Sequence, residues 1–196
     1  MQHAIIVTAG RPIDMTNNSP PPPSGTGPAI TTELTTGTGL RLKVRPVTSA
    51  DEPALAKFFR QVTAEDLRFR FLTAIDEVSH ARLVEMISVD QDQVESFLVT
   101  GPDEAGVLAA AMLAANPAGE RAEVAISIRA DYKGRGIGWS LLGHLADHAR
   151  RKGIRILESI ESRDNHSAIA LEREMGFTAH PVEGDPAPVL LRRQLA

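Results

Sequence analysis

Residues 122–142 read AEVAISIRADYKGRGIGWSLL, and this stretch decides the fold. Its first part, from Glu123 to Ile128, is typical of a strand, and the segment from Lys133 to Gly138 then has a glycine at every second position. From Gly136 onward, the apolar residues fall on one side of a helix that continues to Arg151. A strand followed by a glycine-rich turn and a helix N-terminus can present several backbone N–H groups to a phosphate. The stretch therefore predicts a site for a phosphorylated cofactor.

Strands and helices are predicted on both sides of this stretch. The predicted strands cover residues 41–45, 95–100, 106–115, 123–128, 154–157 and 188–192. Predicted helices run to Arg60 from a capping box of Ser49 and Glu52, over 64–71, from a cap at Ser79, over 136–151, and from Asn165 or Ser167 to Met175. This order of elements predicts an α/β fold with a sheet of mixed direction.

Composition narrows the class of protein. The chain has 196 residues, 42% of them hydrophobic, a net charge of −4 and no cysteine. Disulfides, thiolate zinc sites and cysteine nucleophiles are therefore excluded, and a nucleic-acid partner is not favoured. The longest apolar run, 107–115, is too short to cross a bilayer, and the N-terminus lacks the basic start of a secretory signal. We expect a cytoplasmic protein with no membrane partner.

The N-terminal segment differs from the rest of the chain. Residues 1–38 are rich in proline, glycine and threonine and include four consecutive prolines at 20–23. Such a segment buries too little apolar surface to offset its ordering entropy. We predict a disordered tail over 1–38 and one folded domain over 39–196. A linker is the favoured interpretation of the prolines, and a ligand for an aromatic groove is the alternative.

The spacing of the glycines does not match either of two common nucleotide-binding motifs. Gly134, Gly136 and Gly138 form G-x-G-x-G, whereas the dinucleotide fingerprint requires G-x-G-x-x-G. The Gly-Lys-Ser or Gly-Lys-Thr ending of a P-loop is also missing. A glycine-rich turn without any ligand remains the alternative to a phosphate site.

Two motifs together resemble the GNAT acyltransferases, the GCN5-related family that uses acetyl-CoA. Lys133, Gly136 and Gly138 match the family's Arg/Gln-x-x-Gly-x-Gly/Ala turn, with lysine in the first place. The later run from Asn165 to Phe177 matches Asn-x-x-Ala-x-x-Leu-Tyr-x-x-x-Gly-Phe at all the named positions except the tyrosine. The resemblance implies a mixed, mostly antiparallel sheet flanked by helices, and acetyl-CoA as co-substrate without a metal. The implied cofactor-binding residues are Ile126, Ser127, Ile128, Lys133, Gly134, Arg135, Gly136, Ile137, Gly138, Trp139 and Asn165.

The departure from the second motif bears on the chemistry. Glu172 occupies the place of the tyrosine that protonates the leaving CoA thiolate in many family members. The Pat-like bacterial protein lysine acetyltransferases commonly lack that tyrosine. Val44-Arg-Pro46, Phe58-Phe59 and Arg68-Phe-Arg-Phe71 also resemble the start of Pat-like domains. This resemblance implies a protein lysine side chain as the acceptor.

Glu123 is the candidate general base. An alkylamine with a pKa of about 10.4 must lose a proton before it attacks a thioester, and a carboxylate can accept that proton. Strand alternation separates Glu123 from Val124, and in Pat-like relatives a glutamate at the matching place has this role. We expect direct attack, with the oxyanion stabilised by a backbone N–H near Ile128 or Ala130. A solvent-facing glutamate is the alternative.

Two other functions and several other residues are alternatives. A small-molecule amine acetyltransferase and a non-catalytic acyl-CoA sensor would both keep the glycine turn and Asn165. His144 and His148 have a spacing that can bind zinc, but no third ligand is evident. Asp90 and Asp92 suit either an acidic lip or a polar turn. His166 is expected in a solvated loop, and Arg68 and Arg70 on the outer face of a short helix.

Overall fold

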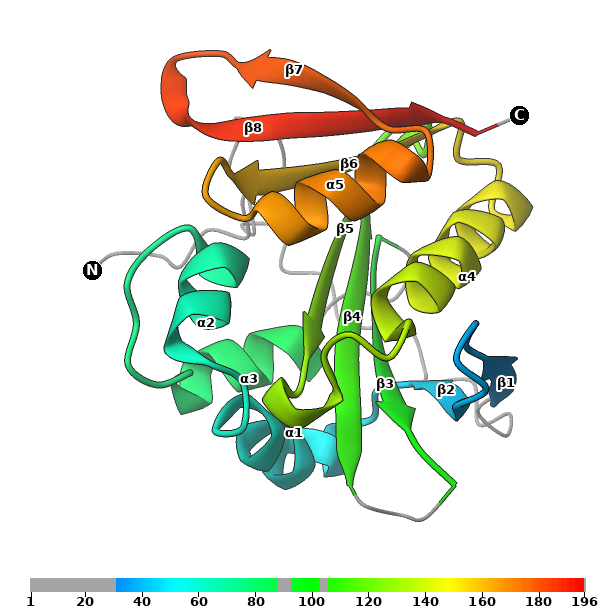
Figure 1. Ribbon diagram of the computed structural model, residues 1–196, viewed down its shortest axis with the longest axis vertical. Coiled ribbons are helices and arrows are strands. Elements are labelled where there is room, and N and C mark those ends of the chain that lie inside the picture. The colour runs from blue at the N-terminus through cyan, green and yellow to red at the C-terminus, as the bar shows by residue number, and fades with distance from the viewer. Residues whose placement is uncertain (1–30, 88–92, 103–105, 196) are drawn as a thin grey trace.

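The computed structural model describes residues 31–87, 93–102 and 106–195, which form a sheet covered by helices (Figure 1). The eight strands lie in the order β1-β2-β3-β4-β5-β6-β8-β7. They are β1 (Thr32–Thr35), β2 (Arg41–Pro46), β3 (Val94–Thr100), β4 (Val107–Ala115), β5 (Arg121–Ile128), β6 (Ile156–Ser162), β7 (Thr178–Val182) and β8 (Asp185–Gln194). The α-helices are α1 (Glu52–Phe59), α2 (Ala64–Phe71), α3 (His80–Ile87), α4 (Ile137–Arg151) and α5 (His166–Glu174). The predicted mixed, mostly antiparallel sheet is confirmed.

One pair of strands departs from the antiparallel pattern. β5 and β6 are parallel, and their pairing joins only Arg121–Glu123 to Ile156–Glu158. Figure 1 shows β6 crossing the upper part of the view below β8, whereas β5 runs downward from it. The two strands therefore separate after Glu123, and the second half of β5 turns one backbone edge toward the space between them.

The helices enclose two apolar cores. In the first core, α4 contributes Leu141, Leu142 and Leu145, which pack against β2 to β6 together with Phe177. In the second core, α1, α2 and α3 pack against Leu98 and Val107. Strand alternation separates the two cores, because Leu98 belongs to one and its neighbours Phe97 and Val99 to the other. The sheet therefore supports α4 on one side and the α1–α3 layer on the other.

The predicted tail ends too late. Residues 32–35 form β1, which pairs with β2 from Thr32↔Val44 to Thr35↔Arg41. The tight turn after β1 is closed by the Thr36 side chain, which accepts a hydrogen bond from the amide of Leu40 at 3.1 Å. The composition of this segment offers little apolar surface to bury, but hydrogen bonds to the neighbouring strand β2 hold it in place. Residues 1–30, including the prolines, lie outside the described residues.

Two further elements differ from the prediction. β7 was not predicted, because the sequence from 178 to 182 lacks a hydrophobic pattern; it pairs with β8 and is exposed along much of its length. The capping box lies one residue earlier than predicted, at Thr48 and Asp51 in place of Ser49 and Glu52. Asp51 also binds Arg45, which holds the pKa of that carboxyl well below its usual range, at about 2. Among the described residues, no helix is both long and apolar enough to span a bilayer.

Candidate active site

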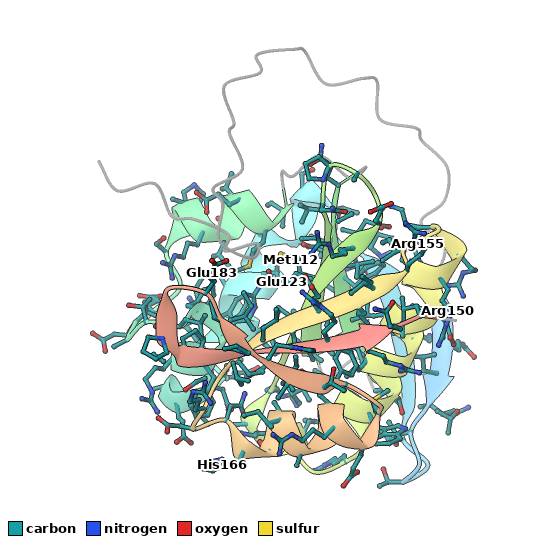
Figure 2. The ribbon with its side chains drawn as sticks, turned by 90° about the horizontal axis from the view of Figure 1, so that it is seen from above. Met112, Glu123, Arg150, Arg155, His166 and Glu183 are labelled. Atoms are coloured by element: carbon teal, nitrogen blue, oxygen red, sulfur yellow. The ribbon has the colours of Figure 1, made fainter. Side chains whose placement is uncertain are left out.

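A cavity of about 440 Å³ opens where β5 and β6 separate. Its walls come from the strand β5, the turn before α4, the first turns of α4 and α5, and the facing sides of α2 and α3. Glu123 and all of the predicted cofactor residues except Arg135 line it. Figure 2 shows Glu123 and Met112 close together near the centre of the view, and both line this cavity.

The glycine turn forms one end of the cavity. Gly136 is the N-cap of α4 and adopts the left-handed conformation with a φ of 78°, which favours glycine. The first intrahelical bond is donated by the amide of Ser140 to the carbonyl of Gly136. The amides of Ile137, Gly138 and Trp139 therefore precede the helical ladder, at the positive end of the helix dipole. This arrangement suits an anion such as a pyrophosphate.

The turn between β1 and β2 supports the glycine turn from behind. The hydroxyl of Thr38 donates a hydrogen bond to the carbonyl of Arg135 at 2.8 Å. A Cβ added at Gly136 would lie only 3.3 Å from the Cβ of Thr36. The segment that composition assigned to a tail thus fixes the backbone of the glycine turn.

The register of β5 determines what its free edge offers. The amide of Arg129 donates a hydrogen bond to β4 at one end of the β4–β5 ladder, and the amide of Asn116 donates one to β5 at the other end. Along an antiparallel ladder, successive residues point their backbone N–H groups to opposite sides. The N–H groups of the odd-numbered residues of β5 therefore point to β4, and those of Ile126 and Ile128 point toward β6. The predicted role of Ala130 as an oxyanion donor is wrong, because its amide donates to the carbonyl of Gln61 at 3.0 Å.

Glu123 lies where β5 leaves β6. It is the last residue of β5 that pairs with β6, and its carboxylate is only partly exposed. Val124 faces the α4 core, so the neighbouring Glu123 faces the other side of the sheet, as predicted. An electrostatic attraction couples Glu123 to the guanidinium of Arg70, which comes from α2. The cavity therefore presents a partly shielded carboxylate with a guanidinium near it.

The predicted cationic side chains are engaged elsewhere. The ammonium of Lys133 contacts both carboxylate oxygens of Asp66, at 2.8 and 2.9 Å. The guanidinium of Arg135 lies over the ring of Tyr132, 4.5 Å from its centroid, and does not line the cavity. Trp139 is 46% exposed at the cavity mouth. An anion at the glycine turn would therefore be held by backbone amides more than by these two cations.

Asn165 connects α5 to a buried carboxyl. It is the N-cap of α5, as predicted, with its Oδ1 accepting from the amide of Ala168. Its Nδ2 donates to Glu161 at 2.7 Å. Burial and the nearby charge of Glu172 raise the pKa of Glu161 to about 8. Sequence reasoning missed Glu161, because no motif in the sequence marks it.

Glu172 is the buried residue of α5. It is 6% exposed, lines the cavity and accepts a hydrogen bond from the hydroxyl of Ser159. Burial raises the pKa of its carboxyl to about 7. Glu172 is therefore held inside the cavity with a large neutral fraction near neutral pH.

Replacing Glu161 with glutamine is expected to stabilise the protein at alkaline pH. The pKa of Glu161 rises from 4.5 in the unfolded chain to about 8 in the folded one, so folding favours the neutral carboxyl. The stability that it contributes is complete below pH 4.5 and is lost as the pH rises to about 8. We expect Glu161→Gln to gain about 1 to 3 kcal/mol at pH 8 and little at pH 5, measured by urea unfolding.

Glu158 provides the control for this prediction. It lies on the same strand, is buried, and accepts a hydrogen bond from Arg192 at 2.6 Å. Glu158→Gln breaks this ion pair and is expected to destabilise the protein at pH 8. Equal effects of the two substitutions, or no pH dependence for Glu161→Gln, would contradict the assigned pKa of Glu161.

The half of the cavity between α2, α3 and β4 carries two arginines. Arg70 lines it and donates weakly to the sulfur of Met112 at 3.8 Å, so its predicted place on an outer helix face is wrong. Burial lowers the pKa of Arg70, while Glu123 and Glu161 oppose that shift. Arg82 of α3 also lines the cavity and was not predicted. The available signal was its position four residues before the half-buried Met86, on the same helical face.

The remaining candidates lie away from this arrangement. His148 bonds to Glu95 at 2.9 Å, and in the described ranges no group of three metal-ligating side chains is close enough to hold an ion. His166 is exposed at the start of α5, and Figure 2 shows it far from Glu123. Arg68 is exposed on α2, as expected. Asp90 and Asp92 lie outside the described residues.

Comparison with known proteins agrees with this geometry. Residues 59–177 match the acetyltransferase (GNAT) family. The chain is 30% identical over 159 residues to Acetyltransferase PA5475 of Pseudomonas aeruginosa, covering 80% of this chain and 86% of that protein. Its fold is similar to that of the GNAT domain of S. lividans PAT, with a TM-score of 0.77, 24% identity and coverage of 84% and 97% of the two chains.

A second solved structure is also similar. Spermidine N-acetyltransferase from Vibrio cholerae, solved with CoA and spermine, has a TM-score of 0.65 and 16% identity, with coverage of 79% of this chain and 95% of that one. At this identity the likeness concerns the fold alone. The family match spans both sequence motifs, and together with the Pseudomonas relative it shows that the chain belongs to the GNAT family of acetyltransferases.

Proposed function

We propose that the protein transfers an acetyl group from acetyl-CoA to a primary amine, with a protein lysine side chain as the leading acceptor and Glu123 as general base. The observation that carries this proposal is a single cavity that holds both the free amides at the start of α4 and the Glu123 carboxylate. The first feature suits the pyrophosphate of CoA, and the second suits an amine that must lose a proton.

The proposed reaction proceeds by direct attack. Glu123 accepts a proton from the acceptor ammonium, directly or through a water molecule, and the amine nitrogen then bonds to the thioester carbonyl carbon. The N–H of Ile128, which points toward the gap between β5 and β6, stabilises the oxyanion. The C–S bond then breaks, and the leaving CoA thiolate takes up the second proton of the attacking nitrogen, so that the products are a neutral amide and CoA thiol. No step requires a cysteine, and the chain has none.

Acetyl-CoA is expected to stabilise the fold through the glycine turn. A ligand at roughly a hundred times its Kd stabilises a protein by about 2.7 kcal/mol, which corresponds to a rise in Tm of about 5 to 10 °C for a chain of this size. S-acetylpantetheine, which lacks the pyrophosphate, is expected to give a much smaller shift. Equal shifts from the two compounds in differential scanning fluorimetry would contradict the assignment of the turn.

The acceptor is tested by comparing amines. The Pat-like sequence features support a protein lysine, whereas a fold shared with a spermidine acetyltransferase makes a small amine the alternative. Release of CoA from acetyl-CoA would be measured with a lysine-containing protein and with a panel of small amines. The proposal expects faster release with the protein. Faster release with a small amine would overturn the acceptor, and no release with any amine would overturn the transfer itself.

A further inference from the structure

One cationic nitrogen in the half of the cavity between α2, α3 and β4 lacks a partner. The Nη1 atom of Arg82 is buried and forms no hydrogen bond with any of the described residues. An unpaired, buried guanidinium N–H costs free energy, and buried polar groups in folded proteins nearly always have partners. The cavity wall at Arg82 is therefore complementary to a hydrogen-bond acceptor that the described residues do not supply.

A second guanidinium lies beside the first. The guanidinium carbons of Arg70 and Arg82 lie 5.2 and 4.9 Å from the centroid of the Phe71 ring. Their mutual repulsion contributes to the lowered pKa of Arg70. Arg70 is attracted to the Glu123 carboxylate, whereas no carboxylate lies within ion-pair distance of Arg82 in the part of the chain that the structure describes. The pair thus retains positive charge toward the cavity.

The surroundings of this pair suggest the shape of its ligand. Phe71, Met86 and Met112 line the cavity as well and supply apolar walls. Glu123, which receives the amine proton in the proposed reaction, lines that cavity too and is coupled to Arg70. A ligand with an ammonium group, an apolar chain and a carboxylate would satisfy all three features. A guanidinium is well suited to the last of these, because its planar N–H groups match a carboxylate.

We propose that Arg82, with Arg70 beside it, binds a carboxylate of the acceptor, so that the enzyme selects primary amines that carry an anionic group. This inference rests on the proposed acetyl transfer and narrows its acceptor. The same chemistry can come from a free amino acid or from an acidic residue beside a lysine in a protein substrate. Two series of acceptors separate these sources.

The test compares acceptors that differ only in the carboxylate. Wild-type enzyme is assayed with ω-amino acids of increasing chain length and with alkylamines of equal length, and with peptides in which glutamate or glutamine adjoins the lysine. We expect a preference in kcat/KM of at least about tenfold for the carboxylate-bearing member of one series. The series that shows the preference identifies the source of the carboxylate.

Variants then assign the preference to Arg82. Arg82→Gln is expected to abolish it, mainly through KM, and Arg82→Lys to retain part of it. Arg68→Gln is the matched control, because Arg68 is an exposed arginine that also lies over a ring, that of Phe69, but is not in the cavity wall. It is expected to keep the full preference. An unchanged KM for acetyl-CoA in Arg82→Gln shows that the variant is folded.

The outcomes separate the two proposals. Turnover of amines without a preference for the carboxylate, or a preference that survives Arg82→Gln, overturns the anion site and leaves the transfer intact. No turnover of any amine overturns the transfer. In that case calorimetry with the ω-amino acids decides the anion site, which requires tighter binding to wild type than to Arg82→Gln and is overturned by equal affinities.

Discussion

Replacing Glu123 with glutamine is expected to lower kcat by about a hundredfold or more, because the amide cannot accept the proton that the attacking amine must lose. The substitution keeps the size and polarity of the side chain, so the KM for acetyl-CoA is expected to change little. The pH–rate profile is a more specific test of a general base than the value of kcat at one pH. A glutamate base loses activity as it becomes protonated, so wild type has a fall in rate at low pH that the variant lacks.

Glu120 is the matched control for this substitution. It lies just before β5, is exposed, pairs with Arg155 on the surface and is not in the cavity wall. Glu120→Gln is expected to retain kcat and the shape of the pH profile. If Glu123→Gln behaved like this control in steady-state assays over a range of pH, Glu123 would have no part in the chemistry.

Replacing Gly136 with valine is expected to raise the Kd for acetyl-CoA about a hundredfold. Gly136 has a φ of 78°, which is strained for a β-branched residue, and its new Cβ would meet Thr36 at 3.3 Å. The turn must therefore move, and the amides of Ile137 and Gly138 move with it. Because these amides are proposed to hold the pyrophosphate together, small displacements weaken several hydrogen bonds at once.

Gly153 separates lost binding from lost stability. It follows the other end of α4 and has a φ of 82°, and a Cβ added there would have no atom within 4 Å. Gly153→Val therefore carries similar backbone strain, at roughly 1 to 2 kcal/mol, away from the cavity. Calorimetry is expected to show weakened acetyl-CoA binding for Gly136→Val alone. Equal loss of affinity in both variants would mean that the effect is one of stability.

The parts of the fold that follow local patterns could be predicted from the sequence. The helix 64–71 has the predicted bounds, and the N-cap of α5 is Asn165, because hydrophobic spacing and capping side chains are local signals. β1 and β7 could not be found in this way. Both strands are stabilised by hydrogen bonds to β2 and β8, and a polar sequence gives no local signal for such hydrogen bonds.

The candidate site also has a part that could be predicted from local sequence patterns and a part that could not. The glycine turn and Glu123 lie on one continuous stretch whose strand, turn and helix fix their relative positions, so the sequence could place both beside one cavity. Arg70, Arg82 and Glu161 come from three elements that meet only through the packing of α2 and α3 and the separation of β6 from β5. Thr36 and Thr38 support the turn from a segment whose composition resembles a tail.

Transfer of an isotopically labelled acetyl group tests the central claim most directly. The protein would be incubated with labelled acetyl-CoA and an acceptor amine, and mass spectrometry would follow the label on the acceptor, on the protein and in free acetate. Direct attack predicts one label on the acceptor nitrogen for each CoA released, with none bound covalently to the site. Label that remains on the enzyme, or that appears only as acetate, would contradict direct acetyl transfer to an amine.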